Sequence, residues 1–234
     1  MRSTCLLIGA ALVAAVHVSV GSARAGCAPG VASSLASTGS ASQLVTVVAP
    51  VASSTSGTLR LWQRSGGCWR SAGGPWSVYL GFAGVSASHH EGDGTTPTGA
   101  FALGPVMYGV APDPGAHFAY HRLVCGDWWD EDPGSPGYNT FQHVACGTRP
   151  PFAGASEALW RSPQAYSHLV FVEYNTSPAV PGRGSAIFIH VEIGHPTNGC
   201  VSLAPARMLK LVRWLRPSAS PLIVIGTAAK IAGY

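Results

Sequence analysis

The chain has 234 residues, of which only 10% are charged, and its formal net charge is +4 at pH 7. So small a charge argues against nucleic acid or an anionic membrane surface as a partner. Hydrophobic residues make up 47% of the chain, which indicates a folded protein with one sizeable core and excludes a disordered chain.

The N-terminus is typical of a secretory leader. Arg2 supplies a positive charge, residues 5–20 form an apolar run, and residues 23–25 read Ala-Arg-Ala, which has the A-x-A form of a cleavage site. The apolar run is short for a membrane span. We therefore expect residues 1–25 to be a signal peptide. Acylation of Cys27, as in a lipoprotein, is an alternative.

The predicted leader sets the expected organisation and compartment of the rest of the chain. Residues 26–43 are rich in Ser, Ala and Gly and predict a loose lead-in. Residues 44–234 contain neither a repeat nor a linker, so we expect one main domain there. The mature protein would be exported to the periplasm, the cell wall or the extracellular space, with no stable insertion in the membrane.

The cysteines suggest disulfides and one free thiol. An exported chain favours disulfides, and removal of Cys5 with the leader leaves an odd number of cysteines. Sequence order suggests the pairs Cys27–Cys68 and Cys125–Cys146, which would leave Cys200 free, although other pairings are compatible with the sequence. The chain has no C-x-x-C pair, which argues against a thioredoxin-like redox function.

Short β-rich segments separated by Gly and Pro predict a mainly β domain with a few short helices. A final amphipathic helix is indicated by Pro205 and by the apolar spacing of Met208, Leu209, Leu211, Val212 and Leu215. The expected strands are residues 43–51, 58–64, 76–82, 169–174, 187–193 and 222–225, and the expected helices are residues 156–160, with Ser156 as cap, and 206–215.

Two stretches raise the possibility of a bound metal or ligand. Residues 89–99 hold adjacent histidines and two acids, but their spacing favours a turn network built on Asp93 and Thr95. Residues 107–147 are expected to be irregular. Within them, Trp128 and Trp129 either line a groove for a sugar or peptide or pack in the interior. We expect neither a metal nor a cofactor.

Residues 185–203 combine the features of a nucleophilic site. Alternation places His190 on one face of a strand, with Ile187, Ile189, Val191 and Ile193 on the other face. A short loop then leads to Cys200, close to the expected helix start. A nearby imidazole or helix N-terminus lowers the pKa of a thiol, and the N–H groups of Gly199 and Cys200 can bind an oxyanion. A buried structural cysteine is the alternative.

Four separated stretches carry a family resemblance. The run from His190 to Cys200, which ends in Pro-Thr-Asn-Gly-Cys, resembles the signature of YkuD-like L,D-transpeptidases. Residues 91–99, 130–139 and 181–190 are similar to a compact bacterial branch of that family. The resemblance covers residues 44–226, and four stretches in the right order are far more specific than a lone Gly-Cys.

The resemblance implies a YkuD-like β-sandwich or barrel catalytic domain over residues 44–234 that acts on peptidoglycan stem peptides, without nucleic acid and as a monomer. Cys200 would attack the carbonyl between the L-centre and the D-residue of a tetrapeptide stem, release D-alanine and form a thioester. An amine of a second stem would then give a 3→3 cross-link. His190 would be the proton donor and acceptor, and the expected oxyanion or substrate contacts are Gly199, Asn198, Thr197 and Ser202.

The chain departs from the broader family at two positions. Asn198 stands where a histidine is common, and Ser202 stands where an arginine is common. Serine cannot make the bidentate carboxylate contact of a guanidinium, so the substrate contact is expected to differ. His195 is a second candidate base, but His190 is preferred for its place on the strand. Either Glu192 or a backbone carbonyl would orient the imidazole.

Other functions fit parts of the pattern. A hydrolase on the same substrate would use water in place of the amine, and the sequence does not separate the two. A catalytically silent wall-binding module would bind muropeptides through Trp128 and Trp129. A zinc enzyme using His190, His195 and Cys200 would lack a named fourth ligand. In papain-like peptidases the cysteine precedes the histidine, and here the order is reversed.

Overall fold

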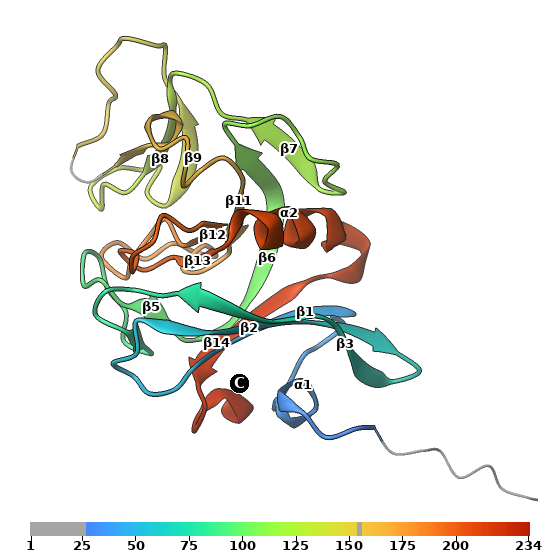
Figure 1. Cartoon of the computed structure of the whole chain (residues 1–234). Coiled ribbons are helices and arrows are strands. Elements are labelled where there is room, and N and C mark those ends of the chain that lie inside the picture. Colours follow the sequence, from blue (N-terminus) through green and yellow to red (C-terminus); the bar gives the residue numbers. More distant parts are fainter. Residues whose placement is uncertain (1–26, 154–155) are drawn as a thin grey trace, which may run out of the picture.

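A computed structural model describes residues 27–153 and 156–234 (Figure 1). The predicted signal peptide, residues 1–25, lies outside the described residues, as does Gly26. Among the helices of the described part, none has the length and apolar character needed to cross a membrane.

The described residues form one large sheet that closes on itself. Its nine strands follow the order β11-β12-β13-β3-β2-β1-β14-β6-β7, and a further pairing of β11 with β6 joins every strand except β7 into a ring. These strands are β1 (Gln43–Ala49), β2 (Ser56–Ser65), β3 (Cys68–Tyr79), β6 (Gly99–Gly109), β7 (Ala119–Arg122), β11 (Leu169–Val172), β12 (Phe188–Val191), β13 (Val201–Leu203) and β14 (Leu222–Thr227). The fold is a mainly β barrel, as predicted.

Smaller elements complete the chain. One small sheet pairs β4 (Val85–Ser86) with β5 (Thr96–Pro97), and another has the order β10 (Glu157–Ala158), β8 (Asp127–Asp130), β9 (Thr140–His143). The helices are α1 (Val31–Ser34) and α2 (Pro205–Trp214), with 3-10 turns η1 (Leu159–Arg161), η2 (Pro217–Ala219) and η3 (Ile231–Gly233). Figure 1 shows β8 and β9 at one end of the molecule and α1 with the C-terminus at the opposite end.

Each predicted strand overlaps an observed one, and the main differences lie in length. β3 starts at Cys68 instead of residue 76, because Gly66 and Gly67 adopt positive φ angles of 58° and 80° and turn β2 directly into a long hairpin. The stretch 107–147 was expected to be irregular, and this was wrong. It carries β7, β8 and β9, which are four residues each and too short to show a clear alternation.

The helix predicted for residues 156–160 is also wrong. Glu157 and Ala158 pair with β8 as a strand, and only one 3-10 turn follows. The hydroxyl of Ser156 does not cap a helix. It accepts a hydrogen bond from the N–H of Glu131 at 3.1 Å, because the pairing of β10 with β8 brings these two segments together.

Two hydrophobic clusters flank the site described below. In the first, α2 packs its buried face against the barrel strands, with Met208, Leu211, Val212 and Leu215 buried as predicted and Leu209 only half-buried. The second lies between β12 and the small sheet of β8–β10. Its buried aromatic members are Tyr108, Trp129, Tyr166, Phe171 and Phe188.

Both tryptophans of β8 pack against other aromatic side chains. Trp129 is only 2% exposed, and its ring contacts Phe171 and Phe188. Trp128 lies edge-on to Phe152 and Trp160. Packing therefore accounts for the buried Trp129 and for the contacts of the half-buried Trp128.

Disulfides tie two outer segments to the barrel. Cys27 is bonded to Cys68 at the start of β3, and Cys125 is bonded to Cys146, which links the two ends of the β8–β9 hairpin. These are the pairs that sequence order suggested. The segment before β1 is not loose, because Ala32 of α1 is buried in a cluster with residues of β1, β14 and η3.

Candidate active site

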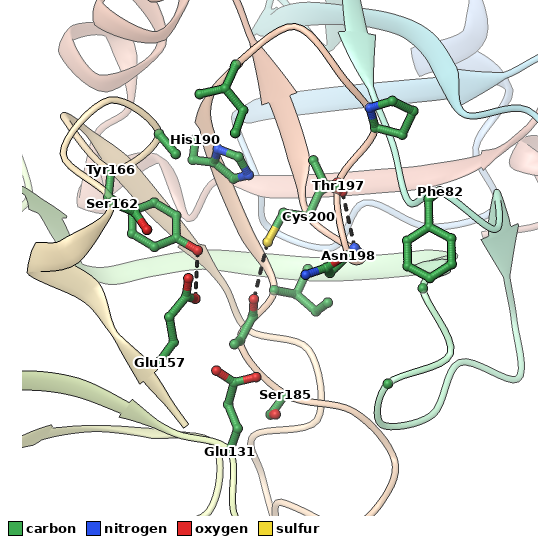
Figure 2. Close-up of a pocket in the computed structure, with 18 of the residues that line it drawn as sticks. Phe82, Glu131, Glu157, Ser162, Tyr166, Ser185, His190, Thr197, Asn198 and Cys200 are labelled. Atoms are coloured by element: carbon green, nitrogen blue, oxygen red, sulfur yellow. Dashed lines mark hydrogen bonds between the residues drawn. The ribbon is translucent and has the colours of Figure 1, made fainter. Parts of the chain in front are cut away.

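A cavity of about 620 Å³ opens between β12, the loop before β13 and the small β8–β10 sheet. Five segments line it: residues 89–94, Glu131, residues 157–166, residues 185–190 and residues 193–200. Figure 2 shows their side chains converging on one space. Phe82 and Ile193, 58% and 51% exposed, also line the cavity. Ile193 was expected on the core face of the strand, but β12 ends at Val191.

Cys200 lies on this cavity and is the free cysteine among the described residues. Its Sγ donates to the carbonyl of Ala186 at 3.3 Å and accepts from the N–H of Phe188 at 3.4 Å. A sulfur that donates is a thiol. Burial raises the pKa of this thiol well above its usual range, and the carboxyl groups of Glu157 and Glu131 raise it further. The resting site therefore holds a thiol and not a thiolate.

The helix starts at Pro205, as expected, but this start is not close enough to Cys200 to act on the thiol. β13 follows the cysteine directly, and α2 begins only at Pro205. Because the effect of a helix N-terminus is confined to its first turn, α2 does not lower the pKa of the thiol. Activation of the sulfur must come from a base that faces the cavity.

His190 on β12 is such a base. It is 6% exposed and lines the same cavity, and Figure 2 shows its imidazole on the same side as the sulfur of Cys200. Its Nδ1 lies 2.9 Å from the carbonyl oxygen of Val191. A carbonyl only accepts, so Nδ1 carries the proton and Nε2 keeps its lone pair. In the described residues, Nε2 has no hydrogen-bond partner.

The surroundings of His190 keep its imidazole neutral and fix its orientation. Burial lowers its pKa to about 4, and the bond to Val191 only partly opposes this shift. The ring of Tyr166 packs edge-on against it, with 5.5 Å between ring centroids. Of the two orienting groups considered from the sequence, the structure shows the backbone carbonyl and not Glu192. The result is a neutral, oriented base at ordinary pH.

The alternative base, His195, lies on an exposed part of the loop. Its Nδ1 is 2.7 Å from the carbonyl oxygen of Pro196, and it also lines the cavity. Both histidines therefore reach the cavity, but only His190 is buried. Within residues 27–153 and 156–234, no three or more His, Cys, Asp or Glu side chains form a group able to hold a metal.

A tight turn before Cys200 is built by Thr197. Its hydroxyl donates to the carbonyl of Cys200 at 2.6 Å and accepts from the N–H of Gly199 at 3.1 Å. Gly199 has a φ of +147°, and a Cβ there would lie 3.0 Å from the carbonyl oxygen of Thr95, so glycine is required. The N–H of Gly199 is thus engaged by the Thr197 hydroxyl. It can serve an oxyanion only after that bond opens.

The other two predicted substrate contacts, Asn198 and Ser202, differ in their exposure. Asn198 is exposed and lines the cavity, so it is available to a substrate. Ser202 is 1% exposed on β13 and pairs in register with His190, but it is not among the residues that line the cavity. Its hydroxyl has no hydrogen-bond partner in the described structure. The predicted substrate contact of Ser202 stays untested, and its burial on a paired strand speaks against it.

The polar loop of residues 89–99 forms the predicted turn network and one wall of the cavity. Asp93 Oδ1 accepts from the N–H and the hydroxyl of Thr95, both at 2.8 Å. His89 Nδ1 lies 2.9 Å from the same carboxylate oxygen. The loop also supplies Glu91 and Gly94 to the lining. Its role in the cavity could not be inferred from turn chemistry.

Three glutamates in the cavity were not singled out from the sequence. Glu91, Glu131 and Glu157 line it, and its described lining contains no Lys or Arg. Tyr166 donates to Glu157 at 2.7 Å, and Tyr138 and Ser185 donate to Glu91. Burial raises the pKa of Glu131 to about 9, with Glu157 and Glu91 adding to the shift. Each glutamate comes from a different short segment, so no periodicity marks them as a group.

Comparison with known proteins gives one match. The family model YkuD, described as the L,D-transpeptidase catalytic domain, matches residues 51–225, which include every residue that lines the cavity. Searches of curated proteins and of solved structures find no significant match to the chain.

Proposed function

The chain belongs to the YkuD family of L,D-transpeptidase catalytic domains, and on this premise we propose that it is an exported cysteine acyltransferase acting on peptidoglycan stem peptides. One observation carries the proposal. Cys200, free of any disulfide, and His190, whose Nε2 keeps its lone pair, line the same cavity. A nucleophile and a base in one cavity are the minimum for acyl transfer through a thioester.

In the first step, Cys200 attacks the carbonyl between the L-centre of the third residue and the terminal D-alanine. His190 Nε2 takes the thiol proton as the carbon–sulfur bond forms, and returns it to the nitrogen of the leaving D-alanine as the peptide bond breaks. Burial keeps the thiol protonated and the imidazole neutral. Proton transfer and attack are therefore coupled, with no resting thiolate–imidazolium pair.

The turn of residues 197–199 would act on the reacting carbonyl. The N–H groups of Gly199 and Cys200 are our proposed oxyanion donors, and the hydroxyl of Thr197 releases the first of these when substrate enters. The exposed Asn198 is the proposed contact to the backbone of the stem. An amine of a second stem then resolves the thioester to a 3→3 cross-link and restores the thiol.

We propose that residues 1–25 direct export and that residues 44–234 form the catalytic domain of a monomer, within which the family match of residues 51–225 lies. Disulfides persist mainly in oxidising compartments. The two disulfides of the structure support a periplasmic, wall-associated or extracellular location.

Intact mass spectrometry of the purified, oxidised protein with a disaccharide-tetrapeptide tests this function. We expect a tripeptidyl adduct, absent from the Cys200→Ala variant, together with a 3→3 dimer. An adduct that yields only free tripeptide would identify a hydrolase on the same substrate. A folded protein that forms no adduct and still binds the muropeptide would instead be a wall-binding module.

A further inference from the structure

The cavity carries a concentration of carboxyl groups without a countercharge. Glu131 and Glu157 face the space beside Cys200 in Figure 2, and no glutamate takes part in an ion pair within the described residues. Glu157 accepts one hydrogen bond, from Tyr166, whereas the carboxyl of Glu131 has no hydrogen-bond donor among the residues that the structure describes. Both residues are half-buried, and carboxyl groups removed from water are normally paired or hydrogen-bonded.

A second polar group in the same cavity is free to accept a hydrogen bond. His190 is 6% exposed and lines the cavity, and its Nε2 has no hydrogen-bond partner in the described part of the chain because Nδ1 is the nitrogen bonded to Val191. The cavity thus presents acceptors from two sides, from the imidazole on β12 and from carboxyl groups on the β8–β10 side. An occupant that donates hydrogen bonds and carries positive charge would satisfy both.

The carboxyl pair faces the sulfur across the cavity. Glu131 and Glu157 line the same cavity as Cys200, and Figure 2 shows both carboxyl groups on the side to which the sulfur points. A cation held at the pair is therefore next to the position of the thioester carbonyl. The group that must reach that position in the second half of the proposed reaction is the amine of the acceptor.

We propose that Glu131 and Glu157 bind the primary ammonium group of the acceptor stem and take its proton before the amine attacks the thioester. This rests on the acyltransferase function proposed above. In this proposal, the two glutamates beside the β8–β10 sheet favour an amine over water as the acceptor. Cys200 and His190 alone do not provide this preference.

The step balances as follows. The acceptor enters as R–NH₃⁺, and one proton passes from nitrogen to a carboxylate oxygen, which leaves R–NH₂ and a carboxylic acid. The nitrogen lone pair forms the C–N bond, and the C–S bond breaks with its electron pair on sulfur. A second proton moves from nitrogen through His190 Nε2 to sulfur. The products are an amide that keeps one N–H and the restored thiol, and the carboxylic acid later releases its proton to water.

The basicity of the pair suits this proton transfer. Burial raises the pKa of Glu131 to about 9 and also raises the pKa of Glu157, so the entering ammonium displaces a proton from Glu131 to water and leaves the carboxylate that the step uses. An alkyl ammonium has a pKa of about 10.4. A base whose pKa lies close to that of its substrate exchanges a proton with little cost, whereas an ordinary carboxylate near pKa 4 would be far too weak.

The first test measures binding and does not depend on catalysis. Titration calorimetry on the Cys200→Ala protein compares a tetrapeptide stem whose side-chain amine is free with the same stem acetylated at that amine. We expect the free amine to bind at least tenfold more tightly. The difference should vanish in Glu131→Gln and Glu157→Gln and remain in Glu173→Gln, which removes a glutamate outside the cavity. Equal binding of both stems overturns the proposal, whether or not Cys200 is the nucleophile.

The second test asks whether the amine that binds the two glutamates belongs to the acceptor stem or to the donor stem. An acetylated tetrapeptide serves as donor only, and a free-amine tripeptide serves as acceptor. In the parent protein the ratio of cross-linked product to hydrolysed donor should saturate with acceptor concentration. Glu131→Gln should lower this ratio about tenfold and make it linear in acceptor. If the folded Glu131→Gln variant keeps the ratio of cross-linked to hydrolysed product, the proposal is overturned. It is also overturned if the variant is impaired only in forming the adduct from the unacetylated donor, because the glutamate would then bind the amine of the donor and not that of the acceptor.

Discussion

His190 Nδ1 donates to the carbonyl oxygen of Val191 at 2.9 Å, and this bond determines which imidazole nitrogen faces the cavity. Because the donor nitrogen is engaged by the backbone, the lone pair on Nε2 is directed to the side where Cys200 lies. His190 and Val191 are neighbours on β12, so this single strand fixes the orientation of the imidazole. The base is therefore positioned without a carboxylate partner.

Replacement of His190 tests that assignment. His190→Gln should lower the rate of adduct formation on Cys200 by about 100-fold or more, since a positioned general base contributes about 10²–10⁴-fold. His195→Gln is the matched control and should change the rate less than about threefold. Rapid-quench mass spectrometry measures both rates. A larger loss in His195→Gln would transfer the role of base to the exposed histidine.

The reactivity of Cys200 should be low at neutral pH. Burial raises the pKa of its thiol, so the thiolate fraction is small and grows only as the pH rises through the alkaline range. We expect alkylation by iodoacetamide at pH 7 to be at least tenfold slower than that of a small free thiol, and to accelerate with pH up to at least pH 10. Intact mass after timed quenching measures it. Fast alkylation at pH 6 would reveal a stable thiolate and contradict this account.

Acid should suppress acylation through His190. Because burial depresses the pKa of the imidazole to about 4, the base is neutral above that pH and becomes protonated below it. The rate of adduct formation should therefore hold down to about pH 5 and fall tenfold per pH unit below about pH 4. A fall that begins near pH 6.5, the ordinary value for histidine, would mean that the imidazole is solvated in the working enzyme.

Gly199 should not tolerate a side chain. Its φ of +147° disfavours other residues, and a Cβ would meet the carbonyl oxygen of Thr95 at 3.0 Å. Gly199→Ala should therefore lower the free energy of unfolding by about 1–3 kcal/mol and reduce acylation. Gly194→Ala is the control, because it also has positive φ but an added Cβ meets nothing within 4 Å. Urea unfolding of both variants compares them. Equal losses would show that the contact with Thr95 is unimportant.

Ser202→Ala should be nearly silent. The hydroxyl is buried without a partner in the described residues, so its removal leaves no acceptor or donor unsatisfied. We expect KM for the tetrapeptide to change less than about twofold and the free energy of unfolding to stay the same or rise. A tenfold increase in KM would show that Ser202 does contact the substrate, as the family resemblance suggested.

The strand that carries the base was predictable, whereas the surroundings of the cysteine were not. Alternation over residues 187–191 separates core residues from His190, and the structure shows the same separation. β13 has only three residues, and its partners β12 and β3 lie far away in the chain. Such a strand leaves no local signal, so no strand was predicted between Cys200 and the helix.

The acidic side of the cavity depends on tertiary pairing alone. Glu131 directly follows β8 and Glu157 opens β10, and the pairing of these two strands brings the glutamates to one site. Neither residue stands in a periodic segment, and a carboxylate in a short polar stretch normally predicts a solvated surface. The two tryptophans of β8 drew attention in the sequence, but Trp129 packs in the second hydrophobic cluster and Trp128 packs against Trp160.

The central claim is that Cys200 is the acyl-accepting nucleophile, and single-turnover mass spectrometry tests it most directly. The protein is mixed with tetrapeptide, quenched in acid at successive times and digested, and the peptide that contains Cys200 is weighed. We predict a tripeptidyl adduct on that peptide which forms and decays at least as fast as product accumulates. Product release without any adduct on Cys200, or with an adduct on another residue, would contradict the account.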